Sequence, residues 1–586
     1  MTRKLLLAFT ALVLFSNAAL SLAKDTQAAG ANAIMSFDSR FHPVVARDGM
    51  ISTQDELAAI VGRDIMARGG NAVDAAVATG FALAVTHPQA GNIGGGGFMV
   101  VHLAKENKTL TIDFREMAPA RATRDMYIGA DGEVNNRLAR GSHLASGVPG
   151  TVMGLLDALD TYGTMTRRQV IGPAIKLADR GFPLSFAMAQ GLAKRQEFFT
   201  RDTSSVDYFS KSGTAYKAGE TFTQKDLAET LRRIQKQGQN GFYKGKTADL
   251  IASEMEKGGG LITTDDLANY KTVTREAVMG EYKSYTIASM PPPSSGGVHI
   301  IQMLNMLSNY DLQADGHNSA NYLHKLTEAM RRAFADRSKY LGDPDFADVP
   351  TQALIDPIYN TAQAASIDTA RASQSVDIMP AAKMPYESPQ TTHYSVIDKD
   401  GNAVSVTYTL NFSYGSGYTV DGAGFLLNNE MDDFSAKPGS PNGYGLVGGE
   451  ANKIEAGKRP LSSMSPVIVL KDGKAVLVTG SPGGSTIITS VLQMVLNVIE
   501  WDMNLAQATA MPRIHHQWLP DVVAVEPGIS VDTLTELESR GFNLVKDEHG
   551  GYARTVLGRV NSVGAGGGVK LGAADTRGPN SAALGH

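Results

Sequence analysis

The sequence predicts a mixed fold, α/β or α+β, in which layered sheets lie between helices. Two β-hairpins with Asp-Gly turns predict the sheets, namely HYSVIDKDGNAVSVTYTLN (393–411) and SPVIVLKDGKAVLVTG (465–480). Capped amphipathic runs between about 150 and 370, and the apolar stretch STIITSVLQMVLNVIEW after the second hairpin, predict the helices.

The composition is that of an ordinary globular protein. Of the 586 residues, 43% are hydrophobic and 19% are charged, and the net charge of −5 gives no reason to expect nucleic acid or an anionic membrane as a partner. The sequence contains no cysteine, which excludes disulfides, cysteine-ligated metals and lipid-modified cysteine.

The first 23 residues are predicted to be a signal peptide. MTRK is a short basic region, LLLAFTALVLF is an apolar core, and Ser21 and Ala23 suit a cleavage site. The apolar core is much shorter than the roughly 20 residues that a spanning helix needs. We therefore expect export, most simply to a bacterial periplasm, and a mature chain that begins near Lys24.

Two helices and a strand after this leader are predicted from their hydrophobic periodicity and capping residues. STQDELAAIVGRDIMARGG predicts a helix with Ser52 or Thr53 as its cap. Asn71 can cap a second helix, AVDAAVATGFALAVTH, which is apolar almost all round and is therefore expected between layers. The alternating strand TLTIDFRE then places Arg115 at its end.

The first hairpin begins with adjacent threonines. Pairing across its turn places Thr391 near Thr409, Leu410 or Asn411, and a one-residue shift of register decides which residue shares its face. One face of the second strand carries only polar side chains: Ser405, Thr407, Thr409 and Asn411. From the hairpin alone, this row is interpreted as the solvent-facing side of an antiparallel sheet.

Three further stretches could carry chemistry. In GSPGGS, Gly483 and Gly484 would present backbone N–H groups at a helix N-terminus, although an ordinary strand-to-helix turn fits as well. An acidic cluster could solvate a surface, bind calcium or hold an ammonium group: Asn428, Asn429, Glu430, Asp432 and Asp433. It lacks EF-hand spacing, which argues against calcium. PGSPNGYGLVGG predicts a lid with Tyr444 at its tip, and RPLSSMSP adds Ser462 and Ser463.

Other familiar motifs are absent or incomplete. The sequence has no G-x-S-x-G elbow, no HExxH and no Walker loop, and GNIGGGG precedes a strand instead of opening a helix as a dinucleotide fingerprint would. The pair His515-His516 is interpreted as structural, because adjacent histidines do not share a helix face and no further ligands cluster with them.

Taken together, these stretches resemble one family. TTHYSVIDKDGNAVSVTYTLN, LLNNEMDDFSAKPG, KRPLSSMSP and VTGSPGGS, in this order, are similar to the small subunit of bacterial γ-glutamyltransferases, also called γ-glutamyltranspeptidases. GNIGGGGFMVVH, DFREMAP, SHLASGVPGTV, GGGLITTDDL and MPPPSSGG are similar to the large subunit. The resemblance covers nearly the whole mature chain.

The resemblance implies an α+β fold, the four-layer αββα sandwich of N-terminal nucleophile hydrolases. It also implies a precursor that cleaves itself between Gln390 and Thr391 into a helix-rich large subunit (24–390) and a catalytic small subunit (391–586), which form a heterodimer. The new α-amine of Thr391, with an ordinary pKa of about 7.7–8.0, would then serve as the base for its own hydroxyl.

The resemblance assigns a role to each remaining site residue. Thr409 is expected to hydrogen-bond and tune the Thr391 hydroxyl. The oxyanion hole is expected to consist of Gly483 and Gly484. The α-carboxylate is expected to bind Arg115, Ser462 and Ser463, and the α-ammonium is expected to bind Asn411, Glu430 and Asp433. Tyr444 matches a lid tyrosine. Asp575 and Arg577 resemble an acidic–basic pair that is structural or needed for maturation.

The implied reaction is acyl transfer from glutathione or another γ-glutamyl compound to water, an amino acid or a dipeptide, with no cofactor or metal. A cephalosporin or glutaryl acylase of the same fold is the alternative, against which Asp433 argues, since an uncharged acyl group would leave this carboxylate unpaired. An exported binding protein that keeps the fold is a third reading. The balance of hydrolysis against transfer and the acceptor preference stay open.

Overall fold

The computed structural model describes residues 39–378, 391–553 and 555–586. The predicted signal peptide (1–23) and Gln390 lie outside the described residues. None of the helices in the described ranges is both long enough and apolar enough to cross a membrane.

Two seven-stranded sheets form the centre of the molecule, and all their neighbouring strands run antiparallel. The β10 sheet has the order β20 (Ala582–Gly585), β2 (Met50–Thr53), β10 (Thr392–Ile397), β11 (Ala403–Thr409), β3 (Gly96–Leu103), β4 (Lys108–Phe114) and β7 (Val273–Glu276). The β14 sheet has the order β1 (Val44–Ala46), β19 (Val569–Ala574), β18 (Asn561–Gly566), β15 (Lys474–Thr479), β14 (Val467–Lys471), β9 (Tyr285–Ser289) and β8 (Val278–Tyr282).

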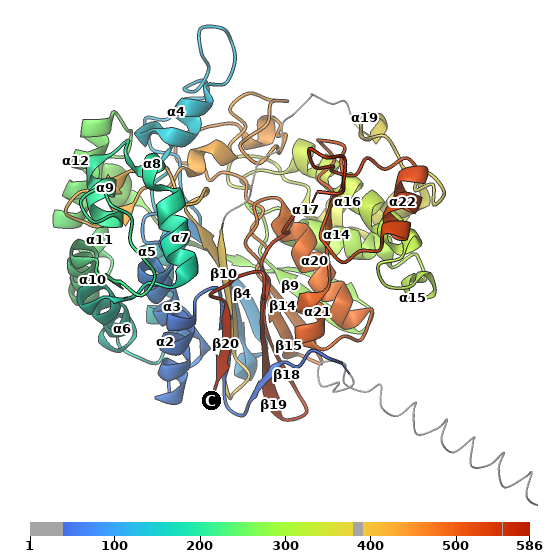
Figure 1. The fold of residues 1–586 in the computed structure, drawn as a ribbon, viewed down its shortest axis with the longest axis horizontal. Helices are drawn as coiled ribbons and strands as arrows, with labels where there is room; N and C mark the ends of the chain where they lie inside the picture. Colours follow the sequence, from blue (N-terminus) through green and yellow to red (C-terminus); the bar gives the residue numbers. More distant parts are fainter. Residues whose placement is uncertain (1–38, 379–390, 554) are drawn as a thin grey trace, which may run out of the picture.

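Helices cover the outer face of each sheet, so the molecule has the four layers of an αββα sandwich (Figure 1). Beside the β10 sheet lie α2 (Glu56–Ala67), α3 (Ala72–Thr86), α5 (Thr151–Tyr162), α6 (Arg167–Arg180), α7 (Phe186–Lys194), α10 (Lys225–Gln237) and α12 (Lys246–Gly258). Beside the β14 sheet lie α14 (Gly296–Leu307), α16 (Ala320–Tyr340), α18 (Pro357–Ala365), α20 (Thr486–Ile499), α21 (Leu505–Ala510) and α22 (Val531–Ser539). The predicted fold class is confirmed.

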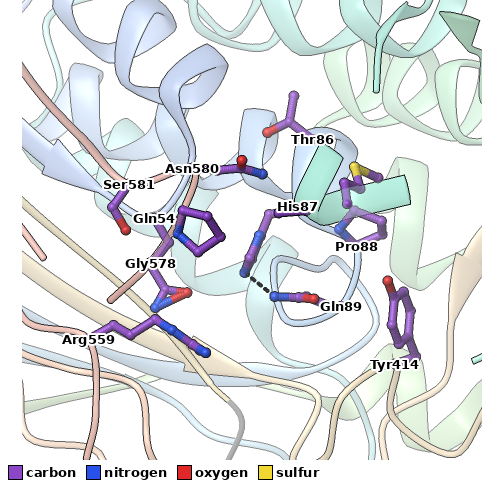
Figure 2. Close-up of a pocket in the computed structure, with 13 residues that line it drawn as sticks. Gln54, Thr86, His87, Pro88, Gln89, Tyr414, Arg559, Gly578, Asn580 and Ser581 are labelled. Atoms are coloured by element: carbon purple, nitrogen blue, oxygen red, sulfur yellow. Dashed lines mark hydrogen bonds between the residues drawn. The ribbon is translucent and has the colours of Figure 1, made fainter. Parts of the chain in front are cut away.

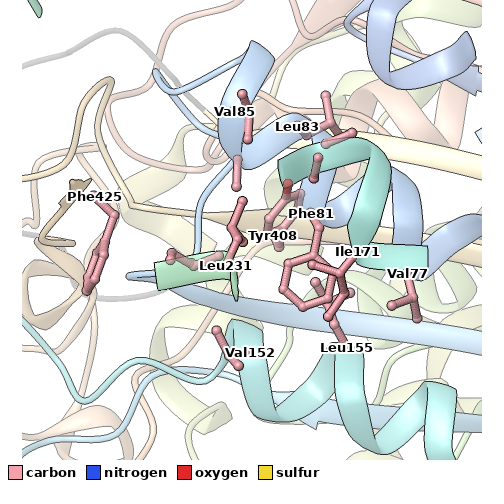
Figure 3. Packing of buried hydrophobic residues seen from close by; sticks show 14 of the residues in the cluster. Val77, Phe81, Leu83, Val85, Val152, Leu155, Ile171, Leu231, Tyr408 and Phe425 are labelled. Carbon is pink, nitrogen blue, oxygen red and sulfur yellow. The ribbon is translucent and has the colours of Figure 1, made fainter. Parts of the chain in front are cut away.

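Helix α3 fills the centre of one helix layer. All fifteen of its residues are buried, as the all-round apolar pattern predicts. Figure 3 shows Phe81 of α3 among Leu155 of α5, Ile171 of α6 and Tyr408 of β11, which form one continuous apolar cluster. Asn71 caps α3 in a reciprocal capping box, confirming the predicted start of this helix.

The start of α2 corrects one prediction. Asp55, not Ser52 or Thr53, is the N-cap, since its carboxylate accepts the Ala58 N–H at 3.1 Å. Ser52 and Thr53 instead belong to β2, where they pair with β10 and β20. Hydroxyl residues suit both a cap and a strand, so the local pattern could not separate the two roles.

The layer between the sheets changes character along the first hairpin. Near its turn the layer is apolar, with Ile397, Ala403 and Ile468 in one cluster. Toward the other end it is polar: the Ser405 hydroxyl donates to the Thr479 carbonyl at 3.1 Å, and the Ser395 hydroxyl donates to the Asn561 carbonyl at 3.0 Å. The interpretation of the polar row as solvent-facing is therefore wrong, because the β14 sheet covers that face.

Two tyrosines on the helix-facing side provide a matched test of this packing. The Tyr408 hydroxyl donates to the Gly80 carbonyl at 2.9 Å, whereas the buried Tyr394 hydroxyl has no hydrogen-bond partner among the described residues. Tyr408→Phe should lower the free energy of unfolding by about 1 kcal/mol, and Tyr394→Phe should leave it unchanged or raise it. Urea unfolding of the two variants checks this; a larger loss for Tyr394→Phe would contradict the assignment.

Candidate active site

The hairpin register places Thr391 opposite Thr409. Strand β10 pairs Thr392 with Tyr408, and one further step in this antiparallel register sets Thr391 against Thr409. Their hydroxyl oxygens lie 3.5 Å apart, with Thr391 as donor. The Asn411 N–H donates to the Thr409 hydroxyl at 2.9 Å. The register left open by the sequence is thus resolved: Thr409 faces Thr391, and Asn411 orients Thr409.

Arg115 follows the end of β4, as predicted, and is completely buried. Its guanidinium makes ion pairs with Glu430 and, at 2.5 Å, with Asp433; Glu116 lies 3.6 Å away. The Arg115 guanidinium therefore faces three carboxylates, one of which, Asp433, also interacts at longer range with the charge of Arg337. This excess of negative charge is costly away from water unless a proton or a second cation balances it.

The ionisation of the cluster reflects that excess. Burial raises the pKa of Glu116 to about 7, although Arg115 opposes the shift. Burial also raises the pKa of Glu430 well above its ordinary value, again opposed by Arg115. For Arg115 itself, burial lowers the pKa, but the carboxylates outweigh burial and hold it above its usual range. The cluster accordingly holds a proton near neutral pH.

Ser462 and Ser463 are held by the turn that contains MPPPSSGG. The Ser462 N–H donates to the Pro293 carbonyl, and the Ser295 N–H and hydroxyl both donate to the Ser462 carbonyl, all at 2.8 Å. Arg337 of α16 donates to the Ser295 hydroxyl at 3.0 Å and to the Ser463 hydroxyl at 3.3 Å. The two serines are thus fixed by elements from another part of the chain.

Sequence reasoning missed two residues here. Arg337 sits in an amphipathic helix with two other buried arginines, Arg331 and Arg332, and no pattern singles it out. Glu116 is adjacent to Arg115 in DFREMAP, so the motif contained it, although no role was assigned.

The GSPGGS turn connects β15 to α20. Gly483 and Gly484 adopt φ angles of 143° and 55°, and a Cβ on Gly483 would lie 2.4 Å from the Thr486 hydroxyl oxygen. Their carbonyls accept hydrogen bonds from the first turn of α20. In the described part of the chain, nothing accepts a hydrogen bond from either N–H, which leaves both donors for a ligand anion.

The predicted lid is closed over the site. The Tyr444 hydroxyl donates to the Asn411 carbonyl at 2.7 Å, and its ring stacks on Phe412 with centroids 4.9 Å apart. The Asn442 amide donates to Asp433 at 3.1 Å, and the Gly443 N–H donates to Asp432 at 2.8 Å. The lid is therefore tied to the acidic segment η5 (Glu430–Asp433) that it covers.

Nearly all the predicted site residues line one small cavity of about 20 Å³. They are Arg115, Thr391, Thr409, Asn411, Glu430, Asp433, Tyr444, Ser462, Ser463 and Gly484. Gly483 adjoins Gly484 but is not itself part of the lining. The cavity combines a hydroxyl pair, free N–H donors and a charged cluster, which is the set needed to hold a zwitterion and attack a carbonyl beside it.

Two other predicted features lie outside the cavity. Asp575 is buried and binds Arg513 at 2.8 Å and Arg577 at 3.0 Å, so this pair joins the C-terminal region to the loop before β16 (Ile514–His515). His515 contacts Thr489 and Gln517, and His516 contacts Asp521, which fits the structural interpretation. No group of His, Asp or Glu in the described ranges is arranged to hold a metal ion.

A family model described as gamma-glutamyltranspeptidase matches residues 58–585. The chain belongs to this family. The glutathione hydrolase proenzyme of Escherichia coli (strain K12) is 54% identical over 518 residues, which cover 88% of this chain and 89% of that protein. The predictions that the chain belongs to this family and that it is an enzyme are therefore confirmed.

Solved structures agree with this family assignment. The γ-glutamyltranspeptidase of Helicobacter pylori is 47% identical with a TM-score of 0.55, over 56% of this chain and 93% of that chain. The cephalosporin acylase of Bacillus halodurans is 27% identical with a TM-score of 0.81, over 94% of this chain and 98% of that chain. The γ-glutamyltranspeptidases and this acylase thus share one architecture.

The raised pKa of Glu116 predicts a pH effect on stability. A carboxyl group that binds its proton more tightly when folded makes stability fall as pH rises from about 4.5 to about 7. Glu116→Gln lacks this carboxyl group and therefore lacks this fall. The free energy of unfolding of the variant minus that of the parent protein should thus rise across that range, by on the order of 1–3 kcal/mol. Urea unfolding at pH 4.5 and pH 8 measures it. The exposed Glu106→Gln is the control, and an equal difference at both pH values would count against the assignment.

Proposed function

We propose that this family member transfers γ-glutamyl groups from glutathione and related compounds to water or to the amines of amino acids and dipeptides, with Thr391 as nucleophile. The observation that carries the proposal is the cavity itself. It places the Thr391–Thr409 hydroxyl pair, the Gly484 N–H and the Arg115 cluster around one small volume. The relative in Escherichia coli bears the name of a glutathione hydrolase proenzyme, which supports the same activity.

The chain is proposed to mature by its own cleavage between Gln390 and Thr391. The Thr391 hydroxyl adds to the Gln390 carbonyl carbon, the peptide nitrogen leaves as an amine, and water then hydrolyses the resulting ester. The products are a large subunit (24–390) and a small subunit (391–586). They stay together as a heterodimer because β10 and β11 of the small subunit lie between β2 and β3 of the large one. A leader at 1–23 would direct export to the periplasm.

Recognition of the substrate follows from charge. A γ-glutamyl group carries an α-carboxylate and an α-ammonium. The carboxylate would bind Arg115 with the Ser462 and Ser463 hydroxyls, while the ammonium would lie between Glu430 and Asp433. The bound zwitterion thereby adds an ammonium beside Glu430 and Asp433 and a carboxylate beside Arg115, without changing the net charge of the cluster.

The reaction has two acyl-transfer steps. Thr391 Oγ1 adds to the γ-carbonyl carbon and its proton passes to the Thr391 α-amine, while the Gly483 and Gly484 N–H groups stabilise the oxyanion. The C–N bond breaks, the departing amine takes the proton, and a γ-glutamyl ester remains on Thr391. Water then releases glutamate, or an acceptor amine forms a new γ-glutamyl amide. None of these steps uses a metal or a cofactor.

An acylase that accepts glutaryl groups is the alternative, because the architecture is shared with a cephalosporin acylase. A glutaryl group has a terminal carboxylate but no ammonium. It would add a negative charge to the cluster and offer no ammonium to Glu430 and Asp433, so the cluster favours the γ-glutamyl group.

Maturation gives the first test of the nucleophile. Thr391→Val should remain a single chain on a denaturing gel and show no turnover, because Val keeps the shape but lacks the hydroxyl. The matched control is Thr392→Val, since the buried Thr392 hydroxyl has no hydrogen-bond partner among the described residues and should be dispensable. N-terminal sequencing of the smaller fragment should read TTHYS for the parent protein. Normal maturation of Thr391→Val would exclude Thr391.

Substrate discrimination gives a second test. The parent enzyme should hydrolyse γ-glutamyl-p-nitroanilide with a higher kcat/KM than glutaryl-p-nitroanilide. Asp433→Asn should shrink this preference roughly 10- to 100-fold, the effect of losing one charged hydrogen bond. Asp432→Asn is the control, because Asp432 binds Arg140 and Gly443 instead of Arg115. A parent enzyme that prefers the glutaryl substrate would favour the acylase reading.

A further inference from the structure

A second pocket, of about 180 Å³, lies apart from the active-site cavity and shares no lining residue with it. Figure 2 shows its labelled side chains, which come from distant parts of the chain: the segment after α3, the loop that carries Tyr414, and the turn 578–581. Arg559 and Gln54 lie on one side of this pocket, across from His87 and Gln89.

The charge of this pocket is unbalanced. Its lining contains Arg559 but no Asp, Glu or Lys. In the described part of the chain, no carboxylate oxygen forms an ion pair with the Arg559 guanidinium; its Nε donates to the Arg577 carbonyl at 3.3 Å. Burial lowers the pKa of Arg559, with Asp575 opposing the shift at longer range. A largely buried guanidinium without an anion is unfavourable, and an anionic ligand would correct this.

Polar groups beside Arg559 also lack partners. Gln54 is 4% exposed, and its side-chain nitrogen has no hydrogen-bond partner among the described residues. The same holds for the Ser581 hydroxyl in the turn 578–581. Because buried donors are normally paired, these groups are arranged for a ligand that accepts hydrogen bonds.

The other walls restrict the kind of anion. Burial, and to a smaller extent the positive charge of Arg559, lowers the pKa of His87 to about 3. The imidazole is therefore neutral near pH 7, and Arg559 is the single cation among the lining residues. One cation matches one negative charge. Pro88, Met188 and the Tyr414 ring add apolar surface beside the polar groups, which suits a short hydrocarbon tail.

We propose that this pocket binds a small organic monocarboxylate, whose carboxylate is held by Arg559 and Gln54 and whose tail lies against Met188 and Tyr414. The proposal does not rest on the proposed function, because no residue of the pocket lines the active-site cavity. Propionate that bound at Arg115 instead would give a shift that Arg559→Gln leaves unchanged.

The test is thermal unfolding of the purified full-length protein with increasing sodium propionate, at an ionic strength kept constant with sodium chloride. A ligand of the folded state raises Tm with its concentration. The shift should be present in the parent protein and in Arg47→Gln, an equal charge change at an exposed position. Arg559→Gln should need at least tenfold more propionate for the same shift. An equal shift in Arg559→Gln, or no shift in the parent, would overturn the proposal.

A second variant tests the same pocket in case Arg559→Gln does not fold. Gln54→Leu removes the unpartnered amide, so the ligand-free Tm should be unchanged or higher, while the propionate shift should shrink. An undiminished shift in this variant would contradict the role of Gln54. Inorganic phosphate and ethylammonium serve as comparison probes. A larger Arg559-dependent shift with phosphate would exclude a monocarboxylate site, and one with ethylammonium would exclude an anion site.

Discussion

The pairing of β10 with β11 is the constraint on which the candidate site depends. This pairing sets Thr391 opposite Thr409, and Asn411 follows directly to hold the Thr409 hydroxyl. A shift of one residue would turn Thr391 toward the helix layer. The register is fixed because one face of the hairpin carries Tyr394 and Tyr408 into the apolar cluster under α3, while the other faces the β14 sheet. Ordinary packing of a sandwich therefore positions Thr391, the proposed nucleophile.

The second constraint is electrostatic. Arg115 is buried and enclosed by Glu116, Glu430 and Asp433, and Tyr444 lines the same cavity. In such surroundings, charges must be matched in number as well as position. A zwitterion leaves the net charge of the cluster unchanged and can place its ammonium beside the carboxylates, whereas a simple carboxylate adds only another negative charge. In the proposed function, the same cluster selects the substrate by its charge.

Much of this structure was predictable from local patterns. Both hairpins, the burial of α3, its cap at Asn71 and the position of Arg115 after a strand follow from periodicity and turn chemistry. The polar face of β11 was misjudged because nothing local indicates that a second sheet covers it. Arg337 was missed for a related reason: its contact with Ser463 joins residues far apart in sequence, and neither residue type marks that partner.

Trapping the acyl-enzyme tests the central claim most directly. The purified enzyme is mixed with a γ-glutamyl donor, quenched in acid within the first turnover, digested with trypsin and examined by mass spectrometry. The account predicts a γ-glutamyl ester on Thr391, in the peptide TTHYSVIDK (391–399), and none on the corresponding peptide of the uncleaved Thr391→Val, which begins at Met384. An adduct on another residue, or turnover with no adduct on this peptide, would contradict it.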